Sequence, residues 1–168
     1  PLVGDGAHSA HFAYSALLPI SPADAGADIW TQSTHKTLPA MNQCACVCVG
    51  NTSMISGSRL KRALTKVQTT SPSYLLLASI DYAHAYMRDK GEQELFAIIS
   101  IADKFRIMVD KLPRLSCPKI AMALDEDIDP LKLIIDVSKT GLSGMTVSKR
   151  LAAVGIHIEA ADTSNILL

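Results

Sequence analysis

The first fifty residues alternate between short apolar runs and polar turns. Three of the apolar runs predict strands: one that ends near Val3, one at residues 28–32 and one at residues 43–49. A polar loop at residues 5–14 follows the first strand, and Ser21, Pro22 and Gly26 have the residue types of an N-cap, a first-turn proline and a helix stop. Strands that alternate with loops and helical turns are typical of an α/β sheet.

Helical spacing replaces this pattern from residue 57 onward. Residues 57–68 place apolar side chains on one face and basic side chains largely on the other, which predicts an amphipathic surface helix. Pro72 interrupts the pattern, and residues 74–112 then predict either two helices or one long bent helix.

A second, smaller α/β unit is predicted after the linker that Pro113 and Pro118 mark. Its expected elements are strands at residues 119–124, 132–137 and 156–160 and a helix at residues 146–153, with Ser143 and Gly144 at the helix cap. We therefore expect one domain over residues 1–112 and a small, incomplete α/β domain over residues 113–168. Both ends of the sequence fall within apolar runs, so we expect a piece of a longer protein.

The composition narrows the class of protein. The 168 residues carry 16 basic and 16 acidic side chains, and 48% of the residues are hydrophobic, which is enough for a buried core. A net charge of zero disfavours nucleic acid and anionic membrane surfaces as partners. No apolar run approaches the roughly 20 residues needed to span a bilayer. The N-terminus lacks the features of a secretory signal, so we expect a cytoplasmic protein.

Cys44, Cys46 and Cys48 alternate within one apolar run, so we expect them on one face of a strand. Neighbours at this spacing do not readily form disulfides with one another. The Cys-x-x-Cys turn that is typical of zinc sites does not accompany them, and we predict no metal. Small, reduced thiols that fill a tight strand environment are the expectation.

The candidate chemistry lies in two polar segments that follow neighbouring strands. Asp5-Gly6-Ala7-His8 follows the first predicted strand, and Ser33-Thr34-His35-Lys36 follows the second. Active sites of open α/β sheets gather at the carboxyl ends of strands, so an acid, a lysine and two histidines are expected to face one another. By itself, a lysine in such a turn is more often a solvated surface charge.

These two segments resemble the cofactor motifs of fold-type-I pyridoxal-phosphate enzymes. Longer stretches are similar to the ornithine/lysine/arginine decarboxylase family: residues 4–12, 25–28, 32–40 and 70–79, with a less specific likeness at residues 129–133 and 141–144. The resemblance implies the C-terminal part of a three-layer α/β/α cofactor domain, followed by the start of a small α/β domain. It also implies decarboxylation of arginine, lysine or ornithine in polyamine metabolism, with pyridoxal 5'-phosphate as cofactor.

The resemblance assigns roles to the matching positions. Lys36 would form the Schiff base with the cofactor aldehyde, and Asp5 would pair with the pyridine nitrogen. Ala7 would lie against one face of the ring. His8 would donate toward the phenolic oxygen of the ring or line the wall of the site.

A second group of residues concerns the cofactor phosphate. Ser33 and His35 would contact it and supply donors to a dianion. Thr70 and Ser71 would either approach a phosphate, that of the neighbouring subunit, or form a plain helix N-cap. A homodimer is expected because sites in this fold are usually completed across a dimer interface.

Two positions depart from the pattern of closer relatives, since Gly6 stands where they often have Glu and Ser9 where they often have Gly. Asp5 and Lys36 serve every fold-type-I activity, so an aminotransferase or an aldol-cleaving enzyme is an alternative. A truncated, non-catalytic remnant is another alternative. In the family, the glycine-containing phosphate loop and the residue that stacks on the cofactor ring precede the position of Pro1.

Overall fold

The computed structural model describes residues 1–51, 53–118 and 128–168, so the predicted strand at residues 119–124 lies outside the described residues. The chain divides into two compact units, residues 1–95 and 96–168. Each unit is described by itself below. The domain boundary expected near residue 113 stays a prediction.

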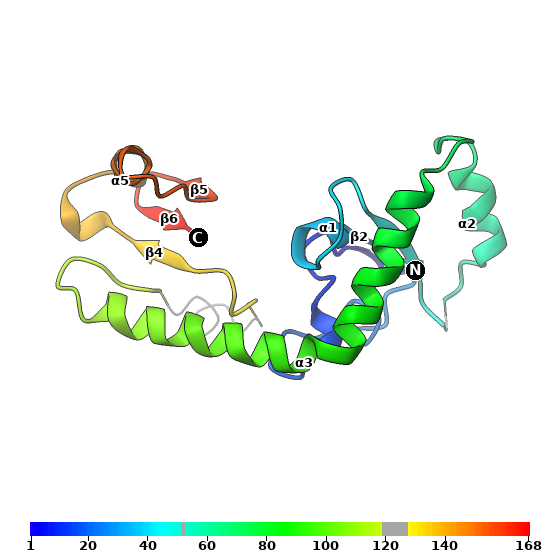
Figure 1. Ribbon diagram of the computed structural model, residues 1–168, viewed down its shortest axis with the longest axis horizontal. Helices are drawn as coiled ribbons and strands as arrows, with labels where there is room; N and C mark the ends of the chain where they lie inside the picture. Colours follow the sequence, from blue (N-terminus) through cyan, green and yellow to red (C-terminus); the bar gives the residue numbers. More distant parts are fainter. Residues whose placement is uncertain (52, 119–127) are drawn as a thin grey trace. The chain divides into compact units, whose positions relative to one another are not determined.

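A three-stranded sheet forms the centre of the first unit (Figure 1). Its strands are β1 (Val3–Asp5), β2 (Ile29–Gln32) and β3 (Cys46–Val49). β2 lies in the middle, parallel to β1 and antiparallel to β3. The predicted strands are present, but β3 begins later than expected. Gln43 has a φ of 74°, and the Cys44 carbonyl bonds to the backbone of His35 instead of to β2.

Alternation along β2 places one side chain in the core and the next in solvent. Trp30 is 8% exposed, whereas Thr31 is exposed. Other apolar side chains buried in this unit are Ala10, Leu18, Ala27, Leu38, Cys44, Ala83, Met87 and Leu95. Trp30 thus packs into the core of the unit, whereas its neighbour Thr31 faces away from it.

The connection from β1 to β2 contains a 3-10 helix, η1 (Phe12–Tyr14), and one further turn. In that turn the Ser21 hydroxyl accepts a hydrogen bond from the backbone N–H of Asp24 at 3.2 Å, and Gly26 has a φ of 79°. The predicted N-cap and stop are thereby confirmed.

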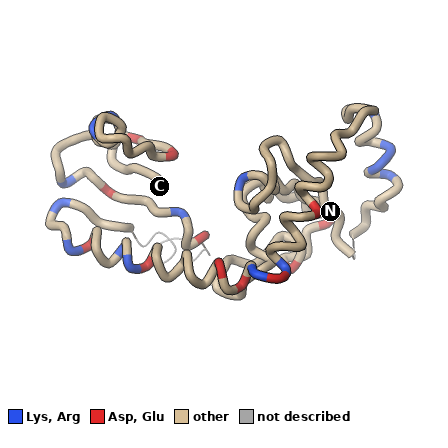
Figure 2. The backbone as a smooth tube through the Cα atoms, in the orientation of Figure 1, with Lys and Arg blue, Asp and Glu red and all other residues tan. Residues whose placement is uncertain are grey.

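Three helices complete the described elements up to residue 110 (Figure 1). They are α1 (Thr34–Thr37), α2 (Gly57–Leu64) and α3 (Tyr74–Asp110). α1 is one turn of helix where we predicted a polar turn, because the Leu38 N–H bonds to the Thr34 carbonyl. α2 begins at the predicted residue, and its basic side chains, whose positions along the backbone are blue in Figure 2, are exposed. The helix ends at Leu64 because the N–H groups of Lys66 and Val67 bond three residues back.

α3 is one continuous helix of 37 residues, which decides between the two alternatives predicted for this segment. Its buried apolar side chains are three, four, seven or eight positions apart: Ala83, Met87, Leu95, Ile99, Ala102 and Val109. Such spacing forms a single stripe along a helix. Within the first unit, the Tyr14 hydroxyl fastens η1 to this helix through a 2.6 Å hydrogen bond with His84 Nδ1.

The second unit contains an antiparallel sheet of three short strands. These are β4 (Ile134–Asp136), β5 (Ala160–Ala161) and β6 (Asn165–Leu167), with β6 in the middle. The 3-10 helix η2 (Ser138–Thr140) follows β4, and α5 (Gly144–Ala153) packs against β5 and β6. A buried cluster forms the core: Val109, Ile135, Val137 and Ile166. Sheets combined with helices in this chain confirm the predicted α/β class.

The cap predicted for the helix of this unit is confirmed, because the Ser143 hydroxyl accepts a hydrogen bond from the Thr146 N–H at 3.2 Å. The strand predicted at residues 156–160 is wrong, since β5 begins only at Ala160. Gly155, with a φ of 82°, ends α5 in a Schellman motif in which the Ile156 N–H bonds to the Leu151 carbonyl. The apolar residue that suggested a strand therefore completes the end of the helix.

Candidate functional site

Two polar segments meet at one edge of the sheet in the first unit. Because β1 and β2 are parallel, both end at this edge, β1 at Asp5 and β2 at Gln32. Asp5 and Thr31 are partners in the register of the two strands. The segment after β1 carries His8, and the helical turn after β2 carries Lys36. The candidate residues of both segments are thus brought to the same edge.

Lys36 and His8 are in direct contact. The Lys36 Nζ lies 3.2 Å from the His8 Nε2, and both side chains are exposed. The contact joins two segments that are 28 residues apart in the sequence. An amine and an imidazole at hydrogen-bond distance can exchange a proton.

Two donors hold the Asp5 carboxylate. Its Oδ1 accepts a hydrogen bond from the backbone N–H of Ala7 at 3.0 Å and one from the Thr31 hydroxyl at 3.1 Å. These hydrogen bonds, the Ala7 one first, lower the pKa of Asp5, and the nearby charges of Lys36 and His8 act in the same direction. The carboxylate is therefore negatively charged at neutral pH.

Burial on one side of α1 sets the direction of Lys36. Thr34 is 0% exposed and Leu38 is 5% exposed, whereas Lys36, half a turn away, is exposed. The turn is closed by hydrogen bonds from the Lys36 N–H to the Ser33 carbonyl and from the Leu38 N–H to the Thr34 carbonyl, both at 3.0 Å. With the opposite side packed into the core, the lysine projects from the sheet edge.

Ser33 and His35 flank the start of the same turn. Ser33 stands at the N-cap position of α1, yet its hydroxyl caps none of the helix N–H groups. The Nδ1 of His35 lies 2.7 Å from the Cys44 carbonyl oxygen, which also accepts the backbone N–H of His35 at 3.1 Å. Because a carbonyl oxygen only accepts, Nδ1 carries a proton, and Nε2 is the ring nitrogen left for another partner.

A glycine lets the first segment fold back onto β2. The Gly6 N–H donates to the Thr31 carbonyl at 3.0 Å, and the Gly6 carbonyl accepts from both the N–H and the hydroxyl of Ser9 at 3.0 Å. A Cβ at position 6 would lie 2.6 Å from the Ser9 Oγ and 2.8 Å from the Thr31 carbonyl oxygen. The absence of a side chain at Gly6 therefore allows the turn that brings the Ala7 N–H to Asp5.

Thr70 and Ser71 lie in the exposed segment before α3. The Ser73 hydroxyl accepts the hydrogen bond from the Leu76 N–H at 3.4 Å, so the N-cap role considered for Thr70 and Ser71 is wrong. The Ser71 N–H bonds instead to the Thr69 hydroxyl at 3.2 Å. A contact of either residue with a phosphate stays a prediction.

Thr31 is the residue of this site that the sequence did not single out. Parallel pairing places it beside Asp5, and its hydroxyl reaches the carboxylate. The strand register reveals this contact, and a single sequence does not give that register. The available signal was a threonine one residue before the end of a predicted strand.

The cysteines of the third strand region remain thiols. Cys44 is buried with its Sγ 3.5 Å from the Leu76 carbonyl, and burial raises the pKa of the Cys48 thiol. Within residues 1–51, 53–118 and 128–168, no group of three His, Cys, Asp or Glu side chains is arranged to hold a metal ion. No helix in these same ranges has the length and apolar character needed to cross a membrane.

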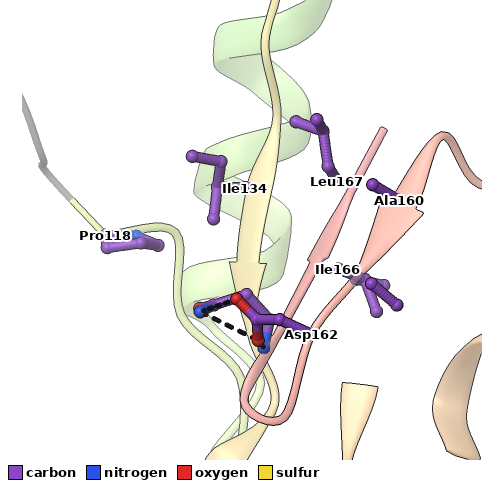
Figure 3. A pocket seen from close by; sticks show the side chains of 8 residues that line it. Pro118, Ile134, Ala160, Asp162, Ile166 and Leu167 are labelled. Carbon is purple, nitrogen blue, oxygen red and sulfur yellow. Dashed lines mark hydrogen bonds between the residues drawn. The ribbon is translucent and has the colours of Figure 1, made fainter. Parts of the chain in front are cut away.

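A hollow in the second unit is lined mainly by apolar side chains (Figure 3). It measures about 580 Å³ and lies against β4, β5 and β6, with Pro118 at its rim. The Oδ1 of Asp162 on its wall already accepts hydrogen bonds from the N–H groups of Ser164 and Asn165 at 2.7 and 2.6 Å. These bonds lower the pKa of Asp162. The carboxylate is used to shape the β5–β6 turn, so the candidate site remains the edge formed by β1 and β2.

The fold and these contacts together define the class: an α/β protein with a lysine, a histidine and an ionised aspartate at the carboxyl ends of adjacent parallel strands. The family model described as "Orn/Lys/Arg decarboxylase, major domain" matches residues 1–126. The chain belongs to this family, which confirms the resemblance found in the sequence.

Two relatives and one solved structure that resemble this chain are longer than it. Over its full length the chain is 37% identical to an uncharacterized protein of Bacillus subtilis, YaaO, and over 99% of its length it is 32% identical to an arginine decarboxylase of Halalkalibacterium halodurans. It spans 35% of each of these relatives. The crystal structure of the Francisella novicida lysine decarboxylase LdcF matches 99% of this chain and 29% of its own, with a TM-score of 0.79 and 22% identity. The chain thus has the fold of part of that enzyme.

Proposed function

We propose that this chain forms part of a pyridoxal-phosphate-dependent decarboxylase that acts on a basic amino acid. One observation carries the proposal: in a chain of the Orn/Lys/Arg decarboxylase family, β1 and β2 bring an ionised aspartate and an exposed lysine to the same sheet edge. The relative named arginine decarboxylase supports a basic substrate. Arginine, lysine and ornithine are the candidates.

The side chains present match the polar groups of pyridoxal 5'-phosphate. The amine of Lys36 suits the aldehyde, and the carboxylate of Asp5 suits the pyridine nitrogen. The uncapped hydroxyl of Ser33 and the Nε2 of His35 suit the phosphate, and Ala7 offers a small side chain for one face of the ring. When bound, the cofactor supplies a sink for the electrons released as carbon dioxide leaves.

Asp5 keeps the ring nitrogen protonated in this proposal. A carboxylate with a lowered pKa stays negative through the neutral range, and a neutral acid would not stabilise a pyridinium charge. Oδ1 is already engaged by Ala7 and Thr31. Oδ2 would therefore be the oxygen for the ring nitrogen.

Lys36 would hold the cofactor through its amine and would be the group placed to return a proton to the substrate carbon. An ammonium group has no lone pair, so the amine must first lose a proton. His8 is the neighbour with which that proton is exchanged, because its Nε2 lies at hydrogen-bond distance from the Nζ.

His35 would contact the phosphate through Nε2. Its Nδ1–H is used by the Cys44 carbonyl, so a donated hydrogen bond from Nε2 requires a second proton on the ring. A dianion beside the ring favours that charged form. Ser33 adds a hydroxyl donor without loss to α1, because it caps none of the helix N–H groups.

Borohydride trapping tests the role of Lys36. The full chain is mixed with pyridoxal phosphate, reduced and mapped by mass spectrometry, and we expect yellow colour before reduction and cofactor mass on Lys36. Lys36→Ala should lose both, whereas Lys61→Ala, at an exposed lysine of α2, should keep both. Colour retained in Lys36→Ala would overturn the assignment. A wild-type chain without colour would favour the non-catalytic remnant.

Product analysis separates decarboxylation from the other fold-type-I activities. Labelled arginine, lysine and ornithine are supplied to the protein with cofactor, and the corresponding amine with release of carbon dioxide is expected from one of them. A keto acid or an aldehyde formed by carbon–carbon cleavage would instead indicate an aminotransferase or an aldol-cleaving enzyme.

The proposal also covers the oligomeric state, the metabolic role and the C-terminal domain. We propose a homodimer or higher homo-oligomer that works in polyamine metabolism in the cytoplasm, with a small C-terminal domain that begins near residue 113. Thr70 and Ser71 would approach a phosphate, that of the neighbouring subunit. Light scattering with and without cofactor measures the assembly, and a monomer under both conditions would contradict it.

A further inference from the structure

We propose that Thr31 is a positioning residue for Asp5, whose hydroxyl selects the carboxylate oxygen that faces the site. The inference rests on the proposed function, because it concerns the carboxylate assigned to the pyridine nitrogen. It adds a residue that acts through Asp5 and that the sequence motifs do not include.

The strand register makes the contact. Asp5 and Thr31 are paired in the parallel ladder between β1 and β2, so their side chains lie side by side at the carboxyl edge of the sheet. The Thr31 hydroxyl is 3.1 Å from the Asp5 Oδ1. The carbonyl of Thr31 also accepts the N–H of Gly6 at 3.0 Å. One residue therefore holds both the acidic side chain and the backbone that follows it.

Two hydrogen-bond donors from different elements fix the rotation of the Asp5 carboxylate, which one donor alone does not do. The carboxylate torsion is roughly two-fold, so a single N–H from Ala7 is satisfied by either oxygen of Asp5. The Thr31 hydroxyl comes from the neighbouring strand and bonds to the same oxygen, Oδ1. Together they fix the rotation of the carboxylate, with Oδ2 directed to a partner outside the loop.

Strand propensity alone does not account for the hydroxyl. Threonine is favoured in strands because it is β-branched, but valine has the same branching and nearly the same shape. Thr31 is exposed, so its hydroxyl does not satisfy a buried backbone group. The hydroxyl bonds to Asp5, which is the feature that a threonine adds over a valine at this position.

Carboxyl titration followed by NMR tests the contact without cofactor. In the full chain, Thr31→Val should raise the pKa of Asp5 toward the ordinary value of 3.8, and Thr31→Ser should keep it close to that of the wild type. The pKa should remain below 3.8 in Thr31→Val because the Ala7 N–H persists. Asp28, whose carboxyl pKa is also lowered by backbone N–H groups, serves as an internal control that should not shift.

Cofactor binding tests the functional part of the inference. Thr31→Val should weaken the apparent affinity for pyridoxal phosphate roughly threefold to tenfold, since a hydrogen bond to a charged but exposed group is lost. Thr31→Val should also shift the pH at which the absorption of the bound cofactor changes. Thr31→Ser, which keeps a hydroxyl, should match the wild type in both properties. Fluorescence of Trp30 under denaturant identifies any variant that is simply unfolded.

The outcomes separate this inference from the proposed function. If the wild type binds the cofactor on Lys36 but Thr31→Val leaves the Asp5 pKa, the affinity and the absorption unchanged, the positioning role is refuted. If the wild type binds no cofactor, the proposed function fails instead. A raised Asp5 pKa in Thr31→Val with unchanged cofactor affinity and absorption would also refute the positioning role, because the hydrogen bond would then have no effect on the site.

Discussion

Gly6→Ala is expected to disturb the loop that follows β1 at the candidate site, because a methyl group at position 6 would collide with β2. The new Cβ would lie 2.6 Å from the Ser9 Oγ, 2.8 Å from the Thr31 carbonyl oxygen and 3.3 Å from the Pro22 Cγ. Real Cβ atoms essentially never approach other heavy atoms within 3.0 Å. The serine hydroxyl can rotate away, but the carbonyl belongs to β2 and cannot move without disturbing the strand.

The magnitude follows from those contacts. A methyl group forced into a packed site typically costs about 1–3 kcal/mol. Displacement of the Gly6 N–H from the Thr31 carbonyl would add about 0.5–1.5 kcal/mol for a lost hydrogen bond. We expect a loss of stability of about 1.5–4.5 kcal/mol in the first unit.

Denaturant unfolding followed by Trp30 fluorescence is the assay, because the chain's single tryptophan is buried in that unit. Gly57→Ala is the matched control, since a Cβ at the first residue of α2 meets nothing within 4 Å. The control should be neutral or more stable by up to about 1 kcal/mol. Equal unfolding midpoints for Gly6→Ala and Gly57→Ala would refute the steric argument.

A second substitution tests which contact dominates. Ser9→Gly in the Gly6→Ala background removes the contact at 2.6 Å but leaves the one to the Thr31 carbonyl at 2.8 Å, so partial recovery is expected. The double-mutant cycle measures the coupling between positions 6 and 9. The Ser9 hydroxyl occupies space that a side chain at position 6 would need.

One further substitution in each unit tests a different interaction: hydrogen bonds to a charged carboxylate in the first unit and close packing of a glycine in the second. Asp28→Asn should lower stability, because both oxygens of Asp28 accept backbone N–H groups at 2.7 and 2.8 Å. The pKa of Asp28 is lowered in the folded chain. The difference in free energy of unfolding between wild type and Asp28→Asn should therefore be largest above pH 3.8 and should vanish as pH falls through the lowered pKa. A difference in free energy of unfolding that grows in acid would contradict this. Gly144→Ala should destabilise the second unit by about 1–3 kcal/mol, measured by thermal unfolding, since its Cβ would lie 2.2 Å from the Asn165 carbonyl oxygen. Gly141→Asn, at a φ of 77° with open space around it, should cost far less.

The sequence predicted the elements of this fold better than their ends. Apolar runs marked β1, β2 and β3 because each run is short and bounded by polar residues. The late start of β3 depends on a positive φ at Gln43, a residue type that seldom signals one. The end of α5 carried a usable signal in Gly155, and recognition of a Schellman motif there would have excluded a strand at Ile156.

For the site, the sequence predicted which residues come together better than it predicted their contacts. The order of strands placed Asp5 and Lys36 at one edge, because the carboxyl ends of parallel strands coincide there. The contacts of His35 with Cys44 and of Thr31 with Asp5 depend on tertiary pairing and register, which a single sequence does not specify. Sequence reasoning therefore found the residues that a motif carries and missed the one that acts through its neighbour.

The two halves of the candidate site are held in place by different forces. The turn that carries Lys36 is fixed by burial of Thr34 and Leu38, which does not depend on the loop after β1. The Asp5 carboxylate, at the end of β1, is fixed by hydrogen bonds from the Ala7 N–H and from the Thr31 hydroxyl of the exposed sheet edge. Loss of these bonds should change the orientation of the carboxylate and raise its pKa toward 3.8, while the lysine remains in position. In the proposed function, capture of the aldehyde by Lys36 and stabilisation of the ring charge by Asp5 would therefore be separable, and we expect substitutions that impair one to leave the other intact.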